Sequence, residues 1–278
     1  MQGMKEEDLE KIEINLFLEA LYQRYGYDFR NYAQASVRRR VRHLLFHSEY
    51  KCISDLTKRL LYDDAFARQV ILEFSIAVTE MFRDPSFYAS VRKNIIPYLN
   101  TYPFLKIWHA GCATGEEVYS LAILLQEENL YDRSTIFATD FNEIVLDKAR
   151  EGIYPLKDIR QYTANYQKAG GTQTFSHYFH AQYDSAIMDR SLKRQVTFAS
   201  HNLATDGVFG EMNLIFCRNV LIYFNRSLQD RVLKLFSDSL ERGGFLCLGN
   251  KESLEFSSVA SQFKAIDGPE RIYQKITR

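Results

Sequence analysis

The sequence predicts an α/β protein in which a mostly parallel sheet is covered by helices and preceded by a small helical domain. Up to about Phe74, apolar residues recur with helical spacing and strand-like runs are scarce. Beyond about Leu105, short apolar runs end in loops and are followed by helical stretches, an alternation typical of βαβ units. With 278 residues, 46% of them hydrophobic, the chain can fill a large core without disulfides.

Residues 1–74 are interpreted as an N-terminal helical domain. Two stripes of apolar residues with helical spacing support this interpretation. They are Ile12, Leu16, Phe17, Ala20 and Leu21, and then Ala33, Val37, Val41, Leu44 and Leu45.

Residues 75–104 are interpreted as a linker that contributes to a cofactor pocket. The pair Asp84-Pro85 favours a turn, and the apolar spacing that follows predicts a connecting helix. The residues with this spacing are Phe87, Val91, Ile95 and Ile96.

Residues 105–278 are expected to form the sheet domain. Four apolar runs predict its strands: LKIWHAGC, STIFATD, MNLIFCRN and GGFLCLGN. The stretch from about 152 to 195 lacks the strand–helix rhythm and is rich in Tyr, Gly and polar residues. We therefore predict a small antiparallel β unit inserted there.

Composition excludes several broad classes. The 35 basic residues balance the 35 acidic ones, so the overall charge favours neither nucleic acid nor a membrane surface as a partner. The four cysteines are scattered without a CxxC pair, which predicts a reduced protein without a metal site. The acidic N-terminus and the lack of a long apolar run predict a cytoplasmic protein that does not insert into a membrane.

The segment HAGCATGEEVYS, residues 109–120, is the strongest local signal. It joins a predicted strand to a predicted helix, and glycines there allow a ligand to approach the backbone and the free N–H groups of the helix N-terminus. The spacing matches neither GxGxxG nor GxxxxGK[ST]. A nucleotide-like cofactor is expected, with a loop that serves only packing as the alternative.

Acidic and amide side chains follow the other predicted strands. Asp140 ends the second strand, where a carboxylate can accept hydrogen bonds from ribose hydroxyls. The alternative is that Asp140 caps the next helix. Asn202, Arg218 and Asn219 follow two further strands, and ligands bind at the carboxyl ends of parallel strands. The set indicates an adenosine-type ligand.

The segments GCATGEEVYS, ATDFNEIVLDKAREGIY, HNL and FCRNVLIYFN resemble, in order and spacing, the successive motifs of the CheR-type chemotaxis receptor methyltransferases. The resemblance covers nearly the whole chain. It implies a Rossmann-like methyltransferase sheet and S-adenosylmethionine as the cofactor, with S-adenosylhomocysteine as its product. It also implies esterification of glutamate side chains on chemoreceptors.

The resemblance also implies roles for individual residues. It places the linker segment VTEMFRDP, residues 78–85, in the cofactor pocket, and it makes Arg83 and Tyr223 the catalytic pair. Arg83 could instead pair with Asp84, and Tyr223 could be a core aromatic residue. Many relatives have Asn where this chain has Ala77, which removes one expected cofactor contact. The expected contacts to the cofactor are Thr79, Arg83, Glu116, Asp140, Asn202, Leu203, Arg218 and Asn219.

The region from Arg30 to Leu60 holds eight Lys or Arg residues against two acids, a local charge of +6. Arg38, Arg39 and Arg42 are expected to form a basic helix face that binds acidic, glutamate-bearing helices of chemoreceptors. A plain solvated surface and a nucleic-acid backbone are the alternatives.

The segment from Tyr183 to Lys193 has no glycine turn, which favours an inserted unit that does not bind a receptor tail. A monomer is expected.

Two other functions compete with this prediction. The chain could bind S-adenosylmethionine or S-adenosylhomocysteine as a sensor or scaffold without catalysis. It could also methylate RNA or a small molecule, because the fold does not fix the substrate. RNA enzymes of this class often carry an Asn-Pro or Asp-Pro-Pro-Tyr loop, and the corresponding segment here is RNVLIYF.

Overall fold

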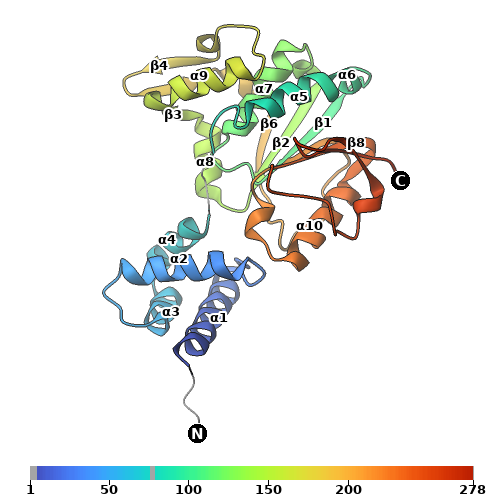
Figure 1. Ribbon diagram of the computed structural model, residues 1–278. Coiled ribbons are helices and arrows are strands. Elements are labelled where there is room, and N and C mark those ends of the chain that lie inside the picture. The colour runs from blue at the N-terminus through green and yellow to red at the C-terminus, as the bar shows by residue number, and fades with distance from the viewer. Residues whose placement is uncertain (1–4, 76–78, 278) are drawn as a thin grey trace. The chain divides into compact units, whose positions relative to one another are not determined.

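The computed structural model describes residues 5–75 and 79–277, which divide into two compact units. One unit contains the N-terminal helices together with Ile222–Gln229, and the other contains the sheets (Figure 1). Ala77 and Val78, which the sequence places at the start of a cofactor-binding segment, lie outside the described residues. Among the residues described, no helix is long and apolar enough to cross a membrane.

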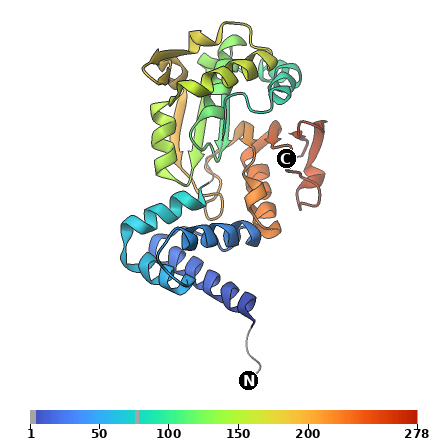
Figure 2. The ribbon, with the colours of Figure 1, turned by 60° about the vertical axis from the view of Figure 1, so that its left-hand side comes forward.

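Four helices build the helical unit (Figure 2). They are α1 (Glu6–Tyr25), α2 (Gln34–Phe46), α3 (Ile53–Tyr62) and α4 (Asp64–Phe74). Gly26 ends α1 in the left-handed conformation, with φ of 79°, which glycine adopts without strain. The Asp63 side chain caps α4 by accepting hydrogen bonds from the backbone N–H groups of Ala65 and Phe66.

The predicted apolar stripe of α1 is wrong for two of its members. Ile12 and Leu16 are 43% and 57% exposed, whereas Phe17 and Leu21 are buried, with Ile14 and Leu18 beside them. The helix has apolar residues on two opposite faces, and only the packing against its neighbours decides which face is covered. In α2 the predicted stripe is confirmed for Val37, Val41 and Leu44, which are buried, whereas Ala33 and Leu45 are half-buried.

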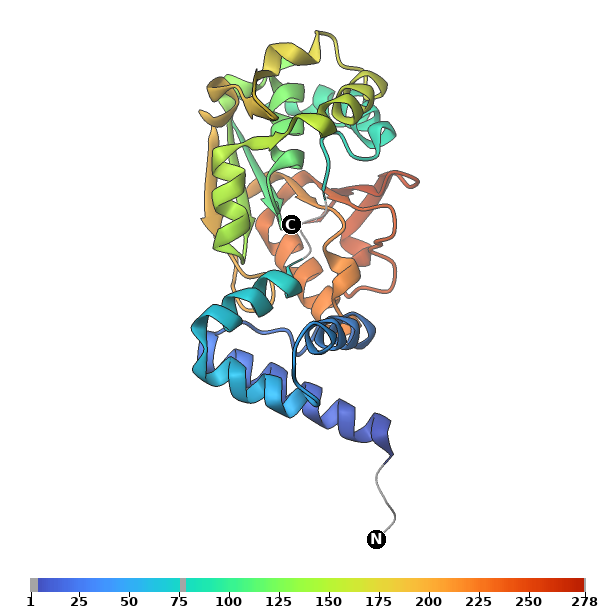
Figure 3. The ribbon, with the colours of Figure 1, turned by 90° about the vertical axis from the view of Figure 1, so that its left-hand side faces the viewer.

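The main sheet has seven strands in the order β6-β2-β1-β7-β8-β10-β9. The first five are parallel, and Figure 3 shows the arrowheads of β6 and the neighbouring strands pointing the same way. Their carboxyl ends therefore lie at one edge of the sheet. The strands are β1 (Leu105–Ala110), β2 (Ser134–Asp140), β6 (Val196–Ser200), β7 (Met212–Cys217), β8 (Leu240–Leu248), β9 (Phe263–Asp267) and β10 (Ile272–Lys275).

The α/β fold predicted from the sequence is confirmed, and the four predicted apolar runs form β1, β2, β7 and β8. The antiparallel strands β9 and β10 were not predicted.

The helices of the sheet unit are α5 (Pro85–Asn94), α6 (Ile96–Leu99), α7 (Glu116–Glu127), α8 (Glu143–Glu151), α9 (Ile159–Lys168) and α10 (Arg226–Ser239), whose first turn is counted with the helical unit. Short 3₁₀ turns occur at Tyr131–Arg133, Leu156–Asp158, Phe175–Tyr178, Arg190–Lys193, Leu221–Tyr223 and Ala260–Gln262.

The segment after Asp84 packs inside the sheet unit. Phe87, Tyr88, Val91 and Ile95 are fully buried in its hydrophobic core, so α5 contributes core residues as well as the connection. Pro85 occupies the first turn of α5, where its missing N–H is of no consequence.

The inserted antiparallel unit is confirmed as a separate three-stranded sheet in the order β3-β5-β4. Its strands are β3 (Ile153–Pro155), β4 (Phe179–Gln182) and β5 (Ser185–Met188), and Figure 1 shows α9 beside β3 and β4. Glu127 at the end of α7 fixes the insertion to the core. Its buried carboxylate accepts hydrogen bonds from the Tyr166 hydroxyl and the Thr172 backbone N–H and pairs with Arg92.

Candidate functional site

A loop with three left-handed residues joins β1 to α7. Gly111, Ala113 and Gly115 have φ values of 76°, 49° and 93°. A Cβ atom on Gly111 would lie 2.7 Å from Val220 Cγ2, and one on Gly115 would lie 2.9 Å from Ala149 Cβ. Glycine is therefore required at both positions by conformation and by space. The loop presents the N-terminus of α7 at the carboxyl edge of the parallel strands.

Asp140, the last residue of β2, organises this loop. Its Oδ2 accepts a hydrogen bond of 3.1 Å from the Ala113 backbone N–H, and its Oδ1 accepts one of 3.0 Å from the Asn142 backbone N–H. The side chain that caps α8 is that of Asn142, which accepts from the Ile144 backbone N–H. Burial raises the pKa of Asp140 to about 6.

Glu116 is the first residue of α7 and is only 6% exposed. Its carboxylate accepts a 2.6 Å hydrogen bond from the Thr114 hydroxyl. Burial raises the pKa of Glu116 to about 7, because desolvation disfavours its charged form. A cationic group placed beside this carboxylate would restore its ionisation.

The turn around Arg83 has an unusual backbone. Phe82 and Asp84, on either side of Arg83, have φ values of 52° and 55°, a conformation that non-glycine residues adopt only when their surroundings enforce it. The Phe82 backbone N–H donates a 2.8 Å hydrogen bond to the Ser120 hydroxyl of α7. The Asn165 amide of α9 donates a 3.0 Å hydrogen bond to the Met81 carbonyl.

Arg218, which follows β7, is almost fully enclosed, with a side chain 1% exposed. Its guanidinium lies 2.8 Å from Asp84 Oδ2 and 2.8 Å from Glu117 Oε2, and it covers the Phe87 ring at 3.9 Å. Burial opposes ionisation of Glu117, but the Arg218 guanidinium and the neighbouring His109 hold the pKa of this carboxyl below its usual value.

The remaining predicted cofactor residues are held in turns at the strand ends. The Asn202 side chain accepts a hydrogen bond from the Ala204 backbone N–H, and the Leu203 carbonyl accepts one from Arg231. Asn219 has a φ of 62°, and its backbone N–H donates to Glu252. Thr79 is half-buried at the start of the second described segment.

The structure brings the glycine loop, Asp140, Glu116, the Arg83 turn and Arg218 together within the sheet unit. Sequence reasoning missed the supporting role of four residues: Asp84, which it named only as part of a turn and as a possible partner of Arg83, and Glu117, Asn165 and Glu252. The doubled acid Glu116-Glu117 was a visible signal, because two adjacent carboxylates at a helix N-terminus point in different directions. The other three depend on contacts between distant segments.

Tyr223 belongs to the helical unit, as part of the segment Ile222–Gln229. Its backbone carbonyl accepts a 2.8 Å hydrogen bond from the Ala33 N–H, and the Arg40 guanidinium lies 5.8 Å from the centre of its ring. The ring is half-buried. Tyr223 and Arg83 therefore lie in different units, and each is positioned by its own surroundings.

The predicted basic face on α2 is partly neutralised within the helical unit. Arg38 and Arg42 both bind Glu10 of α1, with Nε–oxygen distances of 2.8 and 2.5 Å. Arg39 is exposed, whereas Arg40 is buried and donates a 2.6 Å hydrogen bond to the Glu73 carbonyl. Arg38 and Arg42 remain 38% and 58% exposed beside Glu10, and the binding role of this face stays a prediction.

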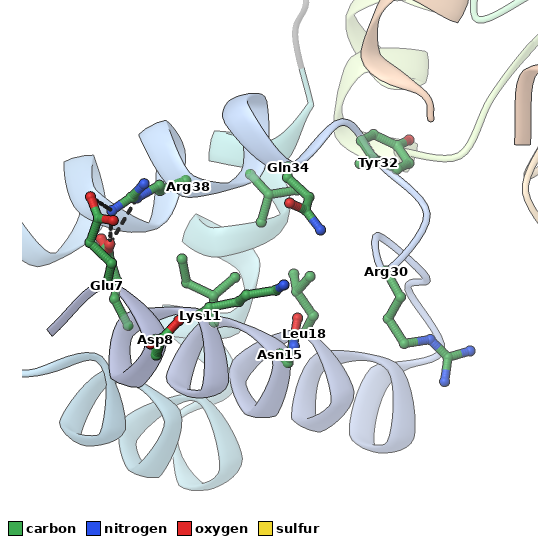
Figure 4. A pocket seen from close by; sticks show the side chains of 12 residues that line it. Glu7, Asp8, Lys11, Asn15, Leu18, Arg30, Tyr32, Gln34 and Arg38 are labelled. Carbon is green, nitrogen blue, oxygen red and sulfur yellow. Dashed lines mark hydrogen bonds and ion pairs between the residues drawn. The ribbon is translucent and has the colours of Figure 1, made fainter. Parts of the chain in front are cut away.

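A hollow of about 250 Å³ opens between α1 and α2. Figure 4 shows Arg38 with its acidic partners at one end of this hollow and Tyr32 and Arg30 at the other. Leu18 contributes an apolar wall. Arg39 and Arg42 line a second depression along α2, so the arginines border a concave surface.

A parallel sheet with a glycine loop and a carboxylate at its strand ends defines a Rossmann-like protein that binds an adenosine-type cofactor. The family model described as the CheR methyltransferase SAM-binding domain matches residues 77–272, and that of the CheR methyltransferase all-alpha domain matches residues 12–75. The chain therefore belongs to the CheR methyltransferase family. It is an S-adenosylmethionine-dependent methyltransferase related to those of chemotaxis.

Three relatives illustrate the similarity. The chain is 51% identical over 264 residues to the "Putative methyltransferase Cher3" of Pseudomonas putida, covering 95% of this chain and 97% of that protein. It is 28% identical to the "Chemotaxis protein methyltransferase" of Listeria innocua, covering 89% and 92%. It is 34% identical to the protein of the same name from Salmonella typhimurium, covering 57% and 54%.

The residues present fit S-adenosylmethionine. The Asp140 carboxylate, at the end of β2, suits ribose hydroxyls. Glu116 is a buried carboxylate whose raised pKa calls for a positive group nearby, and S-adenosylmethionine carries a sulfonium and an ammonium. The residues described include no group of three or more His, Cys, Asp or Glu side chains able to hold a metal ion.

Proposed function

We propose that this methyltransferase esterifies glutamate side chains of chemoreceptors, with S-adenosylmethionine as the methyl donor. The observation that carries the proposal is the match of both CheR domains, which pairs the cofactor unit with a helical unit bearing Arg38, Arg39 and Arg42. The names of the Listeria and Salmonella relatives support a role in chemotaxis.

Six residues besides Arg83 are proposed to contact the cofactor. In this proposal Asp140 accepts hydrogen bonds from the ribose, and ionised Glu116 lies near the positive end of the methionine part. The turns that hold Asn202, Leu203 and Asn219 offer amide and backbone groups at neighbouring strand ends. Thr79 precedes the Arg83 turn and is proposed as a further contact.

The reaction requires little acid–base chemistry from the protein. S-adenosylmethionine supplies a methyl carbon bonded to a positively charged sulfur, and a glutamate with a reference pKa of about 4.3 is already an ionised nucleophile at neutral pH. The protein's task is to orient the acceptor carboxylate and exclude water. Positioning of this kind can supply on the order of 7 to 11 kcal/mol.

Arg83 and Tyr223 are the proposed orienting residues. Arg83 can present a planar fork of N–H donors to a carboxylate, and the turn that carries it is fixed by Ser120 and Asn165. Tyr223 has a hydroxyl donor on a segment anchored through its backbone to Ala33. We propose that both donate to the glutamate that accepts the methyl group.

The partner is proposed to be an acidic helix of a chemoreceptor that binds α2. Arg39 is exposed, and Arg42 retains a side-chain exposure of 58% although it pairs with Glu10. An incoming glutamate-bearing helix could compete with Glu10 for these guanidinium groups. In this proposal the protein acts as a monomer in the cytoplasm.

Transfer of labelled methyl groups tests the proposal. Chemoreceptor-containing membranes would be incubated with S-adenosylmethionine carrying a radioactive methyl group, and base-labile label would be measured on the receptor band. Arg83→Ala and Asp140→Ala serve as variants expected to lose the label. Cofactor binding without any transfer to receptors, RNA or small molecules would replace the proposal with a sensor function.

A further inference from the structure

The Arg83 turn depends on support from outside its own segment. Two non-glycine residues with positive φ surround Arg83, and such a backbone persists only where neighbours over-determine it. Ser120 and Asn165 each fix one backbone group of this turn. Neither of them carries charge, and neither contacts Asp84, the residue that ends the turn.

Arg218 supplies the missing support at Asp84. Its Nη2 donates a 2.8 Å hydrogen bond to Asp84 Oδ2, and its Nη1 lies 3.4 Å from the Arg83 carbonyl oxygen. The same Nη1 donates a 2.8 Å hydrogen bond to Glu117 of α7. One guanidinium thus ties the Arg83 turn to the helix that begins with Glu116.

The surroundings of Arg218 leave it little capacity to bind a ligand. Its side chain is 1% exposed, one face is covered by the Phe87 ring, and Nη1 and Nη2 are occupied by protein oxygens. Nε is also buried, and among the described residues it has no hydrogen-bond partner. His109 extends the cluster, with Nδ1 3.5 Å from Glu117 Oε1 and its ring stacked on Phe216.

We infer that Arg218 is a positioning residue, which acts on the reaction by fixing the Arg83 turn against α7 and does not itself bind S-adenosylmethionine. The inference rests on the proposed function for Arg83. Removing Arg218 would leave the partly buried carboxylates of Asp84 and Glu117, whose side chains are 31% and 18% exposed, without their shared cationic partner, which destabilises their surroundings. The strained turn would then relax, and Arg83 would lose its fixed direction.

Arg92 provides a matched control within the same unit. It also joins two carboxylates, those of Glu127 and Glu128, and its side chain is 13% exposed. It lies on α5, two turns beyond Asp84, and its partners Glu127 and Glu128 lie at the opposite end of α7 from Glu116. Arg92→Met therefore removes a comparable ion-pair cluster without touching the Arg83 turn.

The test measures S-adenosylhomocysteine binding by calorimetry, which needs no receptor substrate. Arg218→Met, Arg83→Ala, the double variant and Arg92→Met would be compared, after thermal unfolding has shown each to be folded at the assay temperature. We expect Arg218→Met and Arg83→Ala each to weaken binding at least fivefold. The double variant should bind within about twofold of Arg83→Ala alone, because both changes remove the same contact.

Two results would overturn the inference. Effects that multiply in the double variant would mean that Arg218 acts independently of Arg83, as a direct ligand does. A lowered melting temperature with unchanged binding, as expected for Arg92→Met, would mean that Arg218 only stabilises the fold. Arg218→Lys, which can reach one carboxylate at a time, should restore part of the lost affinity. Absence of methyl transfer to receptors by the unmodified enzyme would instead refute the proposed function and leave the binding comparison intact.

Discussion

Asp84 and Arg218 are 134 positions apart in the sequence and form an ion pair of 2.8 Å, in which Arg218 is buried and Asp84 is partly exposed. The pair joins the turn that carries Arg83 to the end of β7. Loss of the Asp84 carboxylate would cost stability, because the buried Arg218 charge would lose one of its two anionic partners. Its effect is to fix the position of a turn whose backbone is otherwise strained.

Asp84→Asn tests the other half of this ion pair. The amide keeps a hydrogen-bond acceptor for Arg218 but loses the charge, so we expect kcat for methyl transfer to fall about tenfold with a smaller change in S-adenosylhomocysteine affinity. Steady-state kinetics at saturating receptor and cofactor would measure this. Asp267→Asn is the control. Asp267 accepts a 2.6 Å hydrogen bond from Ser90, a residue of α5, so this change also replaces a carboxylate that contacts the same segment. Equal losses of kcat in Asp84→Asn and Asp267→Asn would contradict the role of Asp84 in fixing the Arg83 turn.

Asp140→Ala should weaken cofactor binding more than tenfold. The substitution removes the proposed ribose acceptor and leaves the backbone N–H groups of Ala113 and Asn142 without their partner, at about 1 to 3 kcal/mol for each buried group. Asp189→Ala is the control, because Asp189 likewise accepts a backbone N–H, that of Ser191, in the inserted unit. Calorimetry with S-adenosylhomocysteine should show normal affinity for the control and not for Asp140→Ala.

The end of the strand that carries Asp140 was predictable, because the local sequence pattern determines where a strand ends. An apolar run followed by a turn residue identifies the end of a strand, and parallel strands share one edge. The partner of Arg218 was not predictable, since nothing in the local sequence of FCRN indicates Asp84. The covered face of α1 was equally hidden, because Leu9, Ile12 and Leu16 form an apolar stripe as convincing as the buried one.

Glu116 predicts a pH dependence of stability. Its pKa in the folded protein is about 7, above the usual value of 4.5, because it is buried. The folded state therefore binds the proton more tightly, and the associated stability is fully present below about pH 4.5 and is lost as the pH rises through 7. Glu116→Gln should remove on the order of 1 to 3 kcal/mol of this pH dependence. Denaturation at pH 5, 6, 7 and 8 without cofactor measures the difference, and identical curves for both proteins would contradict the assignment.

The charge of α2 should govern the Michaelis constant for the receptor. Arg39→Glu combined with Arg42→Glu is expected to raise KM at least fivefold at low salt, with kcat little changed, and the effect should shrink at high salt. Arg59→Glu on α3 is the control, because it changes the charge of one position by the same amount as each of these substitutions. Arg59 pairs with Asp63 and does not line the depression along α2. Glu10→Gln should lower KM, since Arg38 and Arg42 would lose their competing partner. A KM that is indifferent to all of these changes would remove α2 from receptor recognition.

The two faces of α1 should respond very differently to substitution. Phe17 is fully buried, so Phe17→Ala should lower the free energy of unfolding by about 3 to 5 kcal/mol. Leu16, its neighbour, is 57% exposed. Leu16→Ala should therefore change the free energy of unfolding by less than about 0.5 kcal/mol. Urea denaturation followed by circular dichroism measures the free energy of unfolding of both variants. The two variants carry the same replacement, alanine, at adjacent positions of one helix. A large loss for Leu16→Ala would show that the exposed stripe is covered in solution, whereas the expected contrast confirms that neighbouring helices, and not the apolar pattern of α1, select the buried face.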